Sequence, residues 1–207
     1  MTDSGSASPG LHACILVGTL KPSPAQSSSM LMAQQFADAF TGHGVDTDVV
    51  RVVDFDVRPG VDVDMGSGDE WPGLRERIMA ADILGIVSPT WMGHPSSVTQ
   101  RVLERLDGEL SQTNEQGTPL IANRAAVVGV VGNEDGAHKI IADVLQALND
   151  VGLAVPSQAS TYWNGEAMHK VDYKDLPEPP KATVSALTTA AANAVALATA
   201  LRPSRVG

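Results

Sequence analysis

Three stretches of the chain place hydroxyl, amide, glycine and proline residues directly after apolar runs. The first is Thr19 to Ser29 (TLKPSPAQSSS), the second is Ser88 to Pro95 (SPTWMGHP), and the third is Gly132 to Gly136 (GNEDG). The preceding runs have the length and composition of strands that are buried on both faces. A strand that leads through a polar loop into a helix is the junction at which open α/β sheets bind ligands. These stretches are therefore three candidate binding loops.

The first loop is suited to bind a phosphate group. Hydroxyl side chains, backbone N–H groups and the positive end of the following helix all favour an anion, and a lysine adds charge. The loop has neither the G-x-G-x-x-G pattern of dinucleotide sites nor the G-K-[ST] pattern of P-loops. Because hydroxyl residues at a helix start also serve as ordinary caps, that alternative stays open. The candidate residues are Thr19, Lys21, Ser27, Ser28 and Ser29.

The second loop offers a flat apolar wall made by Trp91 and Met92, and Gly93 permits a close approach of the backbone to a ligand. The alternative is that Trp91 packs onto the neighbouring helix or a partner subunit. The third loop carries polar groups beside glycines, and an ordinary tight turn is its alternative. Together the three loops suit a planar heteroaromatic ligand that carries a phosphate.

Other kinds of reactive site find less support. The five histidines lack metal-ligand spacing, and no Ser-His-Asp or Cys-His set has a motif context. The acidic stretch from Asp54 to Glu70 lacks the spacing of a calcium loop, so we interpret it as a solvated loop. Cys14 lies within an apolar strand pattern and is predicted to be a core residue. The chemistry is therefore expected to come from a cofactor.

Composition and charge exclude some classes of binding partner and indicate how the chain is divided into domains. The chain has 207 residues and a formal net charge of −10, which argues against nucleic acid or an anionic membrane surface as the main partner. We predict a disordered start (1–10), a single domain (11–201) and a short tail (202–207). The start lacks the features of a signal peptide, and no stretch is predicted to span a bilayer. We therefore expect a cytoplasmic protein.

The elements that position the loops alternate between strand and helix. This order predicts a flavodoxin-like, three-layer α/β sandwich with a five-stranded parallel sheet in the order 2-1-3-4-5 and helices on both faces. In that order the first and second loops face each other across a crevice. The predicted strands are 11–18, 45–53, 83–87, 125–131, and a last one that starts at 153–155, resumes near 159 and ends at 161–165. The predicted helices run from 27–29 to about 41, around 74–78, from about 96 towards 110, over 140–148, and over 181–201.

The three loops resemble those of the flavodoxin-like NAD(P)H-dependent FMN reductases and their quinone-reductase relatives. Gly18 to Lys21 with Ser27 to Ser29 is similar to the family's G-S-x-R-x-x-S phosphate loop, with threonine for serine, lysine for arginine and a longer spacing. Ser88 to Pro95 resembles the P-x-Y-x-G-S/H-x-P segment around the isoalloxazine ring, with Trp91 where tyrosine is common. Gly132 to Gly136 falls where the family has its third flavin loop. The likeness covers roughly residues 11–165.

The resemblance implies a cofactor, a reaction and roles for individual residues. Thr19, Lys21 and Ser27 to Ser29 would hold the phosphate of FMN. The second loop would line the ring through Pro89, Thr90, Trp91, Met92 and Gly93, and the third would close its far side through Asn133, Glu134, Asp135 and Gly136. Hydride would pass from NADPH or NADH through FMN to a quinone, free flavin or similar small acceptor. The resemblance also implies a homodimer or homotetramer, and Thr161 to Trp163 would border the site or reach it across a subunit interface.

Two other functions remain open on the sequence. A flavodoxin-type electron carrier would bind FMN without a nicotinamide site, and a cofactor-free scaffold would keep only the fold. The length of the chain and its long terminal helix favour the reductase. No residue is identified as a general acid, and the acceptor, the nucleotide preference and the roles of His94 and Trp163 stay undetermined.

Overall fold

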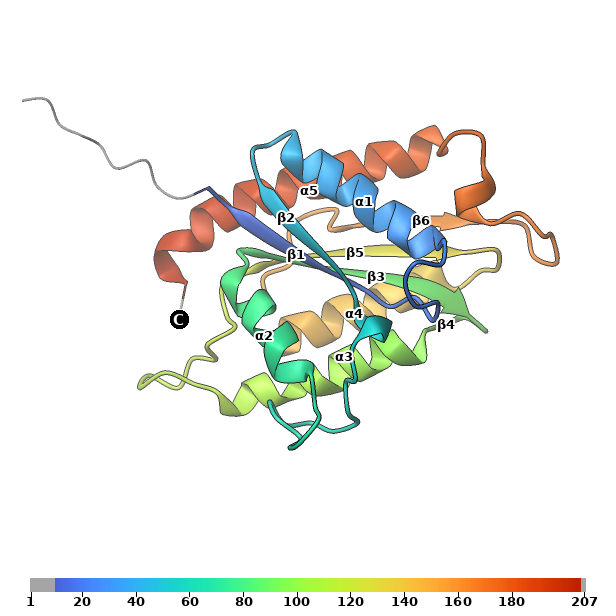
Figure 1. The fold of residues 1–207 in the computed structure, drawn as a ribbon. Helices are drawn as coiled ribbons and strands as arrows, with labels where there is room; N and C mark the ends of the chain where they lie inside the picture. The colour runs from blue at the N-terminus through green and yellow to red at the C-terminus, as the bar shows by residue number, and fades with distance from the viewer. Residues whose placement is uncertain (1–9, 206–207) are drawn as a thin grey trace, which may run out of the picture.

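Five strands run parallel in one sheet, in the order β2-β1-β3-β5-β6 (Figure 1). This arrangement comes from a computed structural model, which describes residues 10–205. It confirms the predicted flavodoxin-like order 2-1-3-4-5. The short strand β4 pairs only with β3 and lies outside this order, so β5 and β6 are the predicted fourth and fifth strands. The predicted disordered start is 1–10, and all of it except Gly10 lies outside the described residues. The strands are β1 (His12–Val17), β2 (Asp46–Arg51), β3 (Ile83–Trp91), β4 (His94–Pro95), β5 (Ala125–Gly132) and β6 (Ser160–Asn164).

Helices cover both faces of the sheet. The pair α1 (Ser28–Thr41) and α5 (Lys181–Leu201) lies on one face, and α2 (Trp71–Ala80), α3 (Ser97–Asp107) and α4 (Ala137–Asp150) lie on the other (Figure 1). Side chains of the strands alternate between the two apolar cores, as the pleat of a strand requires. Cys14 is fully buried in the core between the sheet and helices α2, α3 and α4, and burial raises the pKa of its thiol to about 12. It is a core residue, as predicted.

The strand register brings the three loops to one edge of the sheet. Val17 of β1 lies opposite Val87 of β3, and Val87 lies opposite Gly129 of β5. Beyond that level β1 turns away into the first loop, while β3 and β5 continue side by side to Pro89 and Val131. The loops that follow these three strands therefore open onto the same carboxyl end.

Several element boundaries differ from the predicted ones. The strand predicted to end at Val87 continues to Trp91 and folds back through a hairpin onto β4, so much of the second loop is strand. The last strand is only Ser160–Asn164, and Ala154 makes an isolated bridge to Ala125. Three-residue 3₁₀ turns end two segments, at Val52–Asp54 after β2 and at Arg202–Ser204 after α5. A further 3₁₀ turn, Gly108–Ser111, follows α3 where the sequence predicted more helix.

One described helix bears on the prediction that no stretch spans a bilayer. Within the described residues, Lys181–Ser204 has the length and the mean hydropathy, 1.5, of a helix that could cross a membrane. In this fold it buries one side against the sheet and α1 through small residues, which include Ala190, Ala191 and Ala194. The helix is thus the cover of a sheet face, as predicted, although its composition alone also satisfies the membrane criterion.

The acidic stretch between β2 and α2 is not simply solvated. The carboxylate of Asp69 is fully shielded and pairs with the Arg105 guanidinium of α3 at 2.7 Å. Arg105 also donates to two carbonyls of the same stretch, at Arg58 and Asp62, and lies over the Trp71 ring. The sequence missed this contact because Arg105 lies far along the chain. No group of three or more His, Cys, Asp and Glu side chains in residues 10–205 could hold a metal ion.

We expect Asp69→Asn to lower the free energy of unfolding by roughly 2 kcal/mol at neutral pH, because it leaves Arg105 buried without a charged partner. Burial opposes ionisation of Asp69, but hydrogen bonds from the Met65 N–H and Arg105 outweigh it and lower its pKa to about 2. The wild-type contribution should therefore be complete above about pH 4 and disappear as the pH falls through about pH 2. Urea unfolding of both proteins across this range measures it. Equal acid dependence in the two proteins would contradict the assignment.

Candidate functional site

The three loops enclose one cavity at the carboxyl end of the sheet. Nine of the predicted site residues line it: Thr19, Lys21, Ser27, Ser28, Ser29, Pro89, Thr90, Trp91 and Asn133. The remaining five do not line it, and they are Met92, Gly93, Glu134, Asp135 and Gly136. Six further residues complete the lining: Leu20, Val131, Gly132, Trp163, Asp172 and Tyr173.

Hydroxyl groups organise the first loop at the start of α1. Ser27 is the N-cap, and its hydroxyl accepts a hydrogen bond from the Met30 N–H at 3.4 Å. The same hydroxyl donates to the Thr19 hydroxyl at 3.0 Å, and Thr19 accepts a second bond from the Lys21 N–H at 3.2 Å. The capping alternative is therefore correct for Ser27. The next N–H groups, at Ser28 and Ser29, have no acceptor within the helix and lie at the cavity wall.

The end of β2 holds the proline-containing part of the first loop. Arg51 donates to the Lys21 carbonyl at 3.1 Å and to the Ala25 carbonyl at 2.8 Å. Asp54 accepts hydrogen bonds from the backbone and side chain of Ser23, which lower the pKa of the Asp54 carboxyl. These bonds hold the first loop in place. The loop is longer than that of the family pattern, and its own residues form no helix or strand.

A buried cluster of hydroxyls joins the first loop to the second. Ser96, the N-cap of α3, donates to the Gly18 carbonyl, while the Ser88 hydroxyl accepts bonds from the Ser96 N–H and the Thr99 hydroxyl. Gly18 has no room for a side chain, since an added Cβ would lie 1.9 Å from the Thr99 hydroxyl. The ends of β1, β3 and α3 are therefore tied together directly behind the cavity.

The second loop is a hairpin whose strand residues face the cavity. Thr90 and Trp91 pair with Pro95 and His94, and the turn between them is Met92-Gly93. Trp91 is 53% exposed, so it is not a core residue. The Thr90 hydroxyl is buried at the cavity without a hydrogen-bond partner among the described residues. Such an atom is costly to bury alone, and a polar group of a ligand would satisfy it.

The third loop reaches the cavity only through its first residues. Gly132 lies against Thr90, where an added Cβ would come within 2.6 Å of the Thr90 Cβ. Asn133 also lines the cavity and donates from its side chain to the His169 carbonyl at 3.2 Å. Glu134, Asp135 and Gly136 instead continue towards the hairpin turn, away from the cavity wall. Of the four residues that were predicted to contact the ligand from this loop, Asn133 lines the cavity, and Glu134, Asp135 and Gly136 do not.

A fourth wall comes from residues 163–174, here called the wall segment. Trp163 and Tyr173 place their rings 5.6 Å apart, and the buried Tyr173 hydroxyl donates to the Gln35 side chain of α1. Burial raises the pKa of Tyr173. The Lys174 N–H donates to the Ser28 hydroxyl at 3.3 Å, and its ammonium pairs with Asp172 and Asp175. The family resemblance implied that Thr161 to Trp163 border the site, and Trp163 lines the cavity, but nothing local marks Asp172 or Tyr173.

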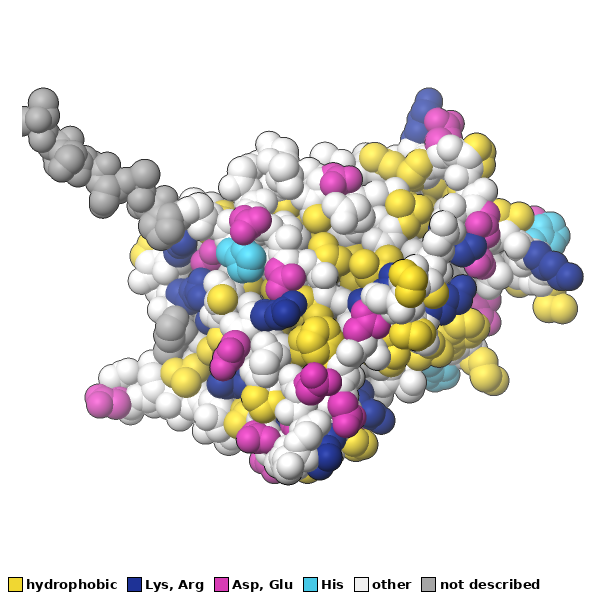
Figure 2. All heavy atoms as spheres, in the orientation of Figure 1, with side chains coloured by type: hydrophobic (Ala, Val, Ile, Leu, Met, Phe, Trp, Pro, Cys, Tyr) yellow, Lys and Arg dark blue, Asp and Glu magenta, His cyan; other side chains and the backbone are white. Residues whose placement is uncertain are grey.

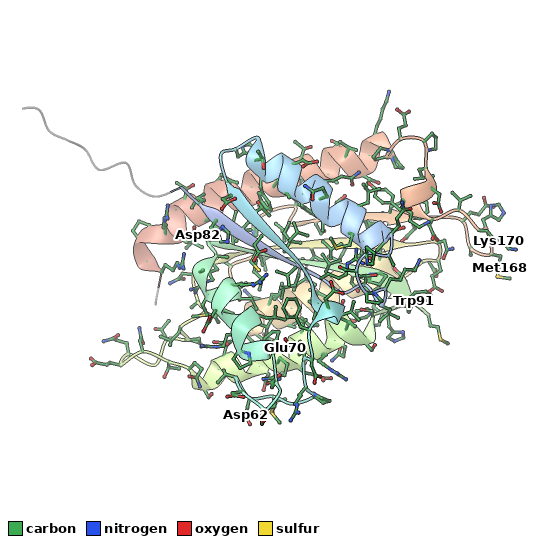
Figure 3. The ribbon with its side chains drawn as sticks, viewed as in Figure 1. Asp62, Glu70, Asp82, Trp91, Met168 and Lys170 are labelled. Carbon is green, nitrogen blue, oxygen red and sulfur yellow. The ribbon has the colours of Figure 1, made fainter. Side chains whose placement is uncertain are left out.

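Apolar side chains surround the mouth of the cavity. Figure 2 shows hydrophobic side chains gathered at the end of the molecule where β3 and β6 finish. In Figure 3 the labelled Trp91 lies at this end, and Met168 and Lys170 project from the wall segment beyond it. Met92 and Met168 are among the most exposed hydrophobic residues of the described chain. The cavity thus has a polar inner end at α1 and an apolar, aromatic outer end.

Fold and cavity together define a class: flavodoxin-like proteins with a site at the carboxyl end of the sheet. A sequence model of the family of NADPH-dependent FMN reductases matches residues 13–167. The chain belongs to this family.

Two curated relatives share about a third of their aligned residues with the chain. An 8-demethyl-8-aminoriboflavin-5'-phosphate synthase of Streptomyces davaonensis is 36% identical in an alignment of 168 residues that covers 76% of this chain and 65% of that protein. A divalent metal cation transporter, MntH, of Mycobacterium bovis is 37% identical in an alignment of 182 residues that covers 84% of this chain but 27% of that protein. The chain therefore spans less than two thirds of either relative.

A solved structure agrees with the synthase match. The crystal structure of RosB with the bound intermediate 8-demethyl-8-formylriboflavin-5'-phosphate is 30% identical, with a TM-score of 0.84. The alignment covers 95% of this chain and 82% of that one.

Trp91→Ala tests whether the hairpin tryptophan lies against a bound flavin ring. We expect the visible absorption and circular dichroism bands of bound flavin to shift, because an aromatic face in contact with the ring is lost. The melting temperature should change little, since about half of the Trp91 side chain is exposed to solvent. Unshifted bands would remove Trp91 from the ring contact, and a large drop in melting temperature would assign it a packing role.

Proposed function

We propose that this protein is an NAD(P)H-dependent FMN oxidoreductase that passes hydride from NADPH or NADH to a small acceptor such as a quinone or a free flavin. The observation that carries the proposal is the buried Thr90 hydroxyl, which has no hydrogen-bond partner among the described residues, in a cavity that runs from a helix N-terminus to an aromatic wall. When bound, FMN would supply the chemistry, accepting hydride from the nicotinamide and giving it to the acceptor.

The inner end of the cavity fits the phosphate of FMN. Ser28 and Ser29, whose N–H groups have no acceptor within α1, line this end together with Thr19, and a helix N-terminus favours an anion. Lys21 adds a positive charge from the first loop. Lys174 stands close by, although its charge is balanced by Asp172 and Asp175. The site would thus hold a phosphate mainly through backbone and hydroxyl hydrogen bonds.

The outer end fits the ring. Trp91 of the hairpin and Trp163 with Tyr173 of the wall segment offer aromatic surfaces for a planar heterocycle. Gly132 lies against Thr90 at a position where a side chain would clash, and the Thr90 hydroxyl can bond a polar atom of the ring edge. The chain's part in the reaction would be to hold the flavin, keep one face accessible and exclude water from the other. We infer no general acid.

The decisive experiment is an absorption spectrum of the purified protein with added FMN, followed by anaerobic NADPH and then NADH. A yellow complex that bleaches with either nucleotide supports the reductase and reports the nucleotide preference. A yellow complex that neither nucleotide bleaches would favour an electron carrier of the flavodoxin type. A protein that ignores FMN would overturn the proposal and favour a cofactor-free scaffold.

A second candidate function follows from the relatives. The synthase and RosB are named for flavin phosphates altered at position 8 of the ring, and they match this chain over most of its length. The same cavity could therefore hold a flavin phosphate as a substrate. Mass spectrometry of the flavin recovered after incubation distinguishes the two functions, because a reductase returns FMN unchanged and a flavin-modifying enzyme does not.

The setting of the activity is also a proposal. We infer a cytoplasmic protein that assembles as a homodimer or homotetramer, acts on a small-molecule acceptor, and has no nucleic-acid partner. The net charge of −10 supports the absence of a nucleic-acid partner. The face drawn in Figure 2 also mixes acidic and basic side chains and has no continuous basic patch. Sedimentation of the FMN-loaded protein measures its assembly state.

A further inference from the structure

Glu134 of the third loop reaches away from the cavity to the tip of the hairpin. Its carboxylate accepts a hydrogen bond from the Met92 N–H with an N–O distance of 2.6 Å. Glu134 is half-buried and does not line the cavity, so it is not placed to touch a bound flavin. A bond from a neutral N–H to an ionised carboxylate is among the stronger hydrogen bonds in proteins.

The turn that Glu134 holds has an unfavourable backbone. Met92 has a φ of 53° and Gly93 a φ of 74°, so both central residues of this two-residue hairpin are in the left-handed region. Turns with positive φ at both positions strongly prefer Asn-Gly, Asp-Gly or Gly-Gly, and a methionine there costs energy. The Met92 carbonyl is also engaged, at 2.7 Å from Nδ1 of His94. Both polar groups of Met92 are therefore bonded while its side chain is 87% exposed.

Glycines bring the third loop and the hairpin into direct contact on both sides of this bond. An added Cβ at Gly136 would lie 2.7 Å from the Gly93 Cα, and Gly132 is similarly close to Thr90. The strand residues Thr90 and Trp91, which line the cavity, lead straight into the turn. The position of the turn therefore sets the position of this cavity wall.

We propose that Glu134 is a positioning residue that fixes the strained Met92-Gly93 turn and thereby holds Thr90 and Trp91 against the flavin ring. The proposal rests on the proposed function, since it assumes a flavin in the cavity. It assigns Glu134 a role different from the direct cofactor contact that the family resemblance implies. It also explains why a methionine is tolerated where the turn favours asparagine.

The first test compares Glu134→Ala with Glu134→Gln. We expect the alanine variant to bind FMN about tenfold more weakly, a factor equivalent to 1.4 kcal/mol, and to shift the visible circular dichroism of the bound flavin. The glutamine variant keeps an acceptor oxygen and should stay within about threefold of the wild type. Glu115→Ala removes an exposed carboxylate from a distant loop and is the control for net charge.

The second test uses the turn itself. In the Glu134→Ala background, Met92→Asn creates the Asn-Gly pair that adopts this turn without strain, and we expect it to restore most of the lost FMN affinity. Near-wild-type affinity in Glu134→Gln, together with rescue of Glu134→Ala by Met92→Asn, supports a positioning role for Glu134. Equal FMN affinity and spectra in the wild type and Glu134→Ala would overturn it, as would a failure of Met92→Asn to restore either. If the wild type itself binds no FMN, the proposed function fails instead, and the two failures are distinct.

Discussion

Gly18→Ala is expected to lower the free energy of unfolding by roughly 3 kcal/mol or more, through overpacking and the loss of buried hydrogen bonds. An added Cβ at this position would lie 1.9 Å from the Thr99 hydroxyl and 3.1 Å from the Ser96 hydroxyl. Neither side chain can move freely, because both belong to the cluster that ties β1, β3 and α3 together. Relief of the clash would therefore break that cluster.

The matched control is Gly73→Ala in the first turn of α2, where an added Cβ meets nothing within 4 Å. Alanine favours a helix over glycine by up to about 1 kcal/mol, so this variant should be as stable as the wild type or slightly more so. Thermal and urea unfolding of the three proteins measures the difference. A Gly18→Ala protein as stable as Gly73→Ala would show that the first two loops are not joined through Ser96 and Thr99.

The sheet could be predicted from the sequence because its central strands carry their own signal. Residues 83–87 of β3 and 125–131 of β5 are continuous apolar runs. Such runs are typical of strands that are buried on both faces of a sheet. The extension of β3 to Trp91 was not predictable from local pattern, because Pro89 and the polar residues around it suggest a break. At that level β1 no longer pairs with β3, so Pro89 interrupts no ladder on that side.

Some residues of the site could likewise be predicted from the neighbouring sequence, whereas others depend on contacts between distant parts of the chain. The hydroxyls of the first loop and the hairpin tryptophan follow apolar strands directly, so their place at the cavity could be predicted. Tyr173 lines the cavity and bonds Gln35, and the neighbouring Lys174 N–H bonds Ser28, each partner more than a hundred positions away in the chain. Glu134 was predicted to face the ligand, whereas the structure turns it to the hairpin. Contacts of this kind depend on the assembled fold and leave no local pattern.

Ser28→Asp is expected to weaken FMN binding at least about 100-fold, since it would place a carboxylate beside a phosphate dianion in a partly buried site. Ser28 lines the inner end of the cavity at the first turn of α1. The fold should not suffer, because an aspartate in the first turn of a helix interacts favourably with the helix dipole. Loss of affinity and retention of stability are therefore expected in the same variant.

Riboflavin, which lacks the phosphate, separates this effect from a general disturbance of the cavity. Its binding should be nearly the same in the wild type and in Ser28→Asp, whereas FMN binding differs. Ser67→Asp adds the same charge to an exposed loop far from the cavity and should leave both affinities unchanged. Fluorescence titrations with the two flavins measure all of these values. If FMN and riboflavin lost affinity equally in Ser28→Asp, the phosphate would not lie at the start of α1, and the orientation of the flavin inferred for this cavity would have to be reversed.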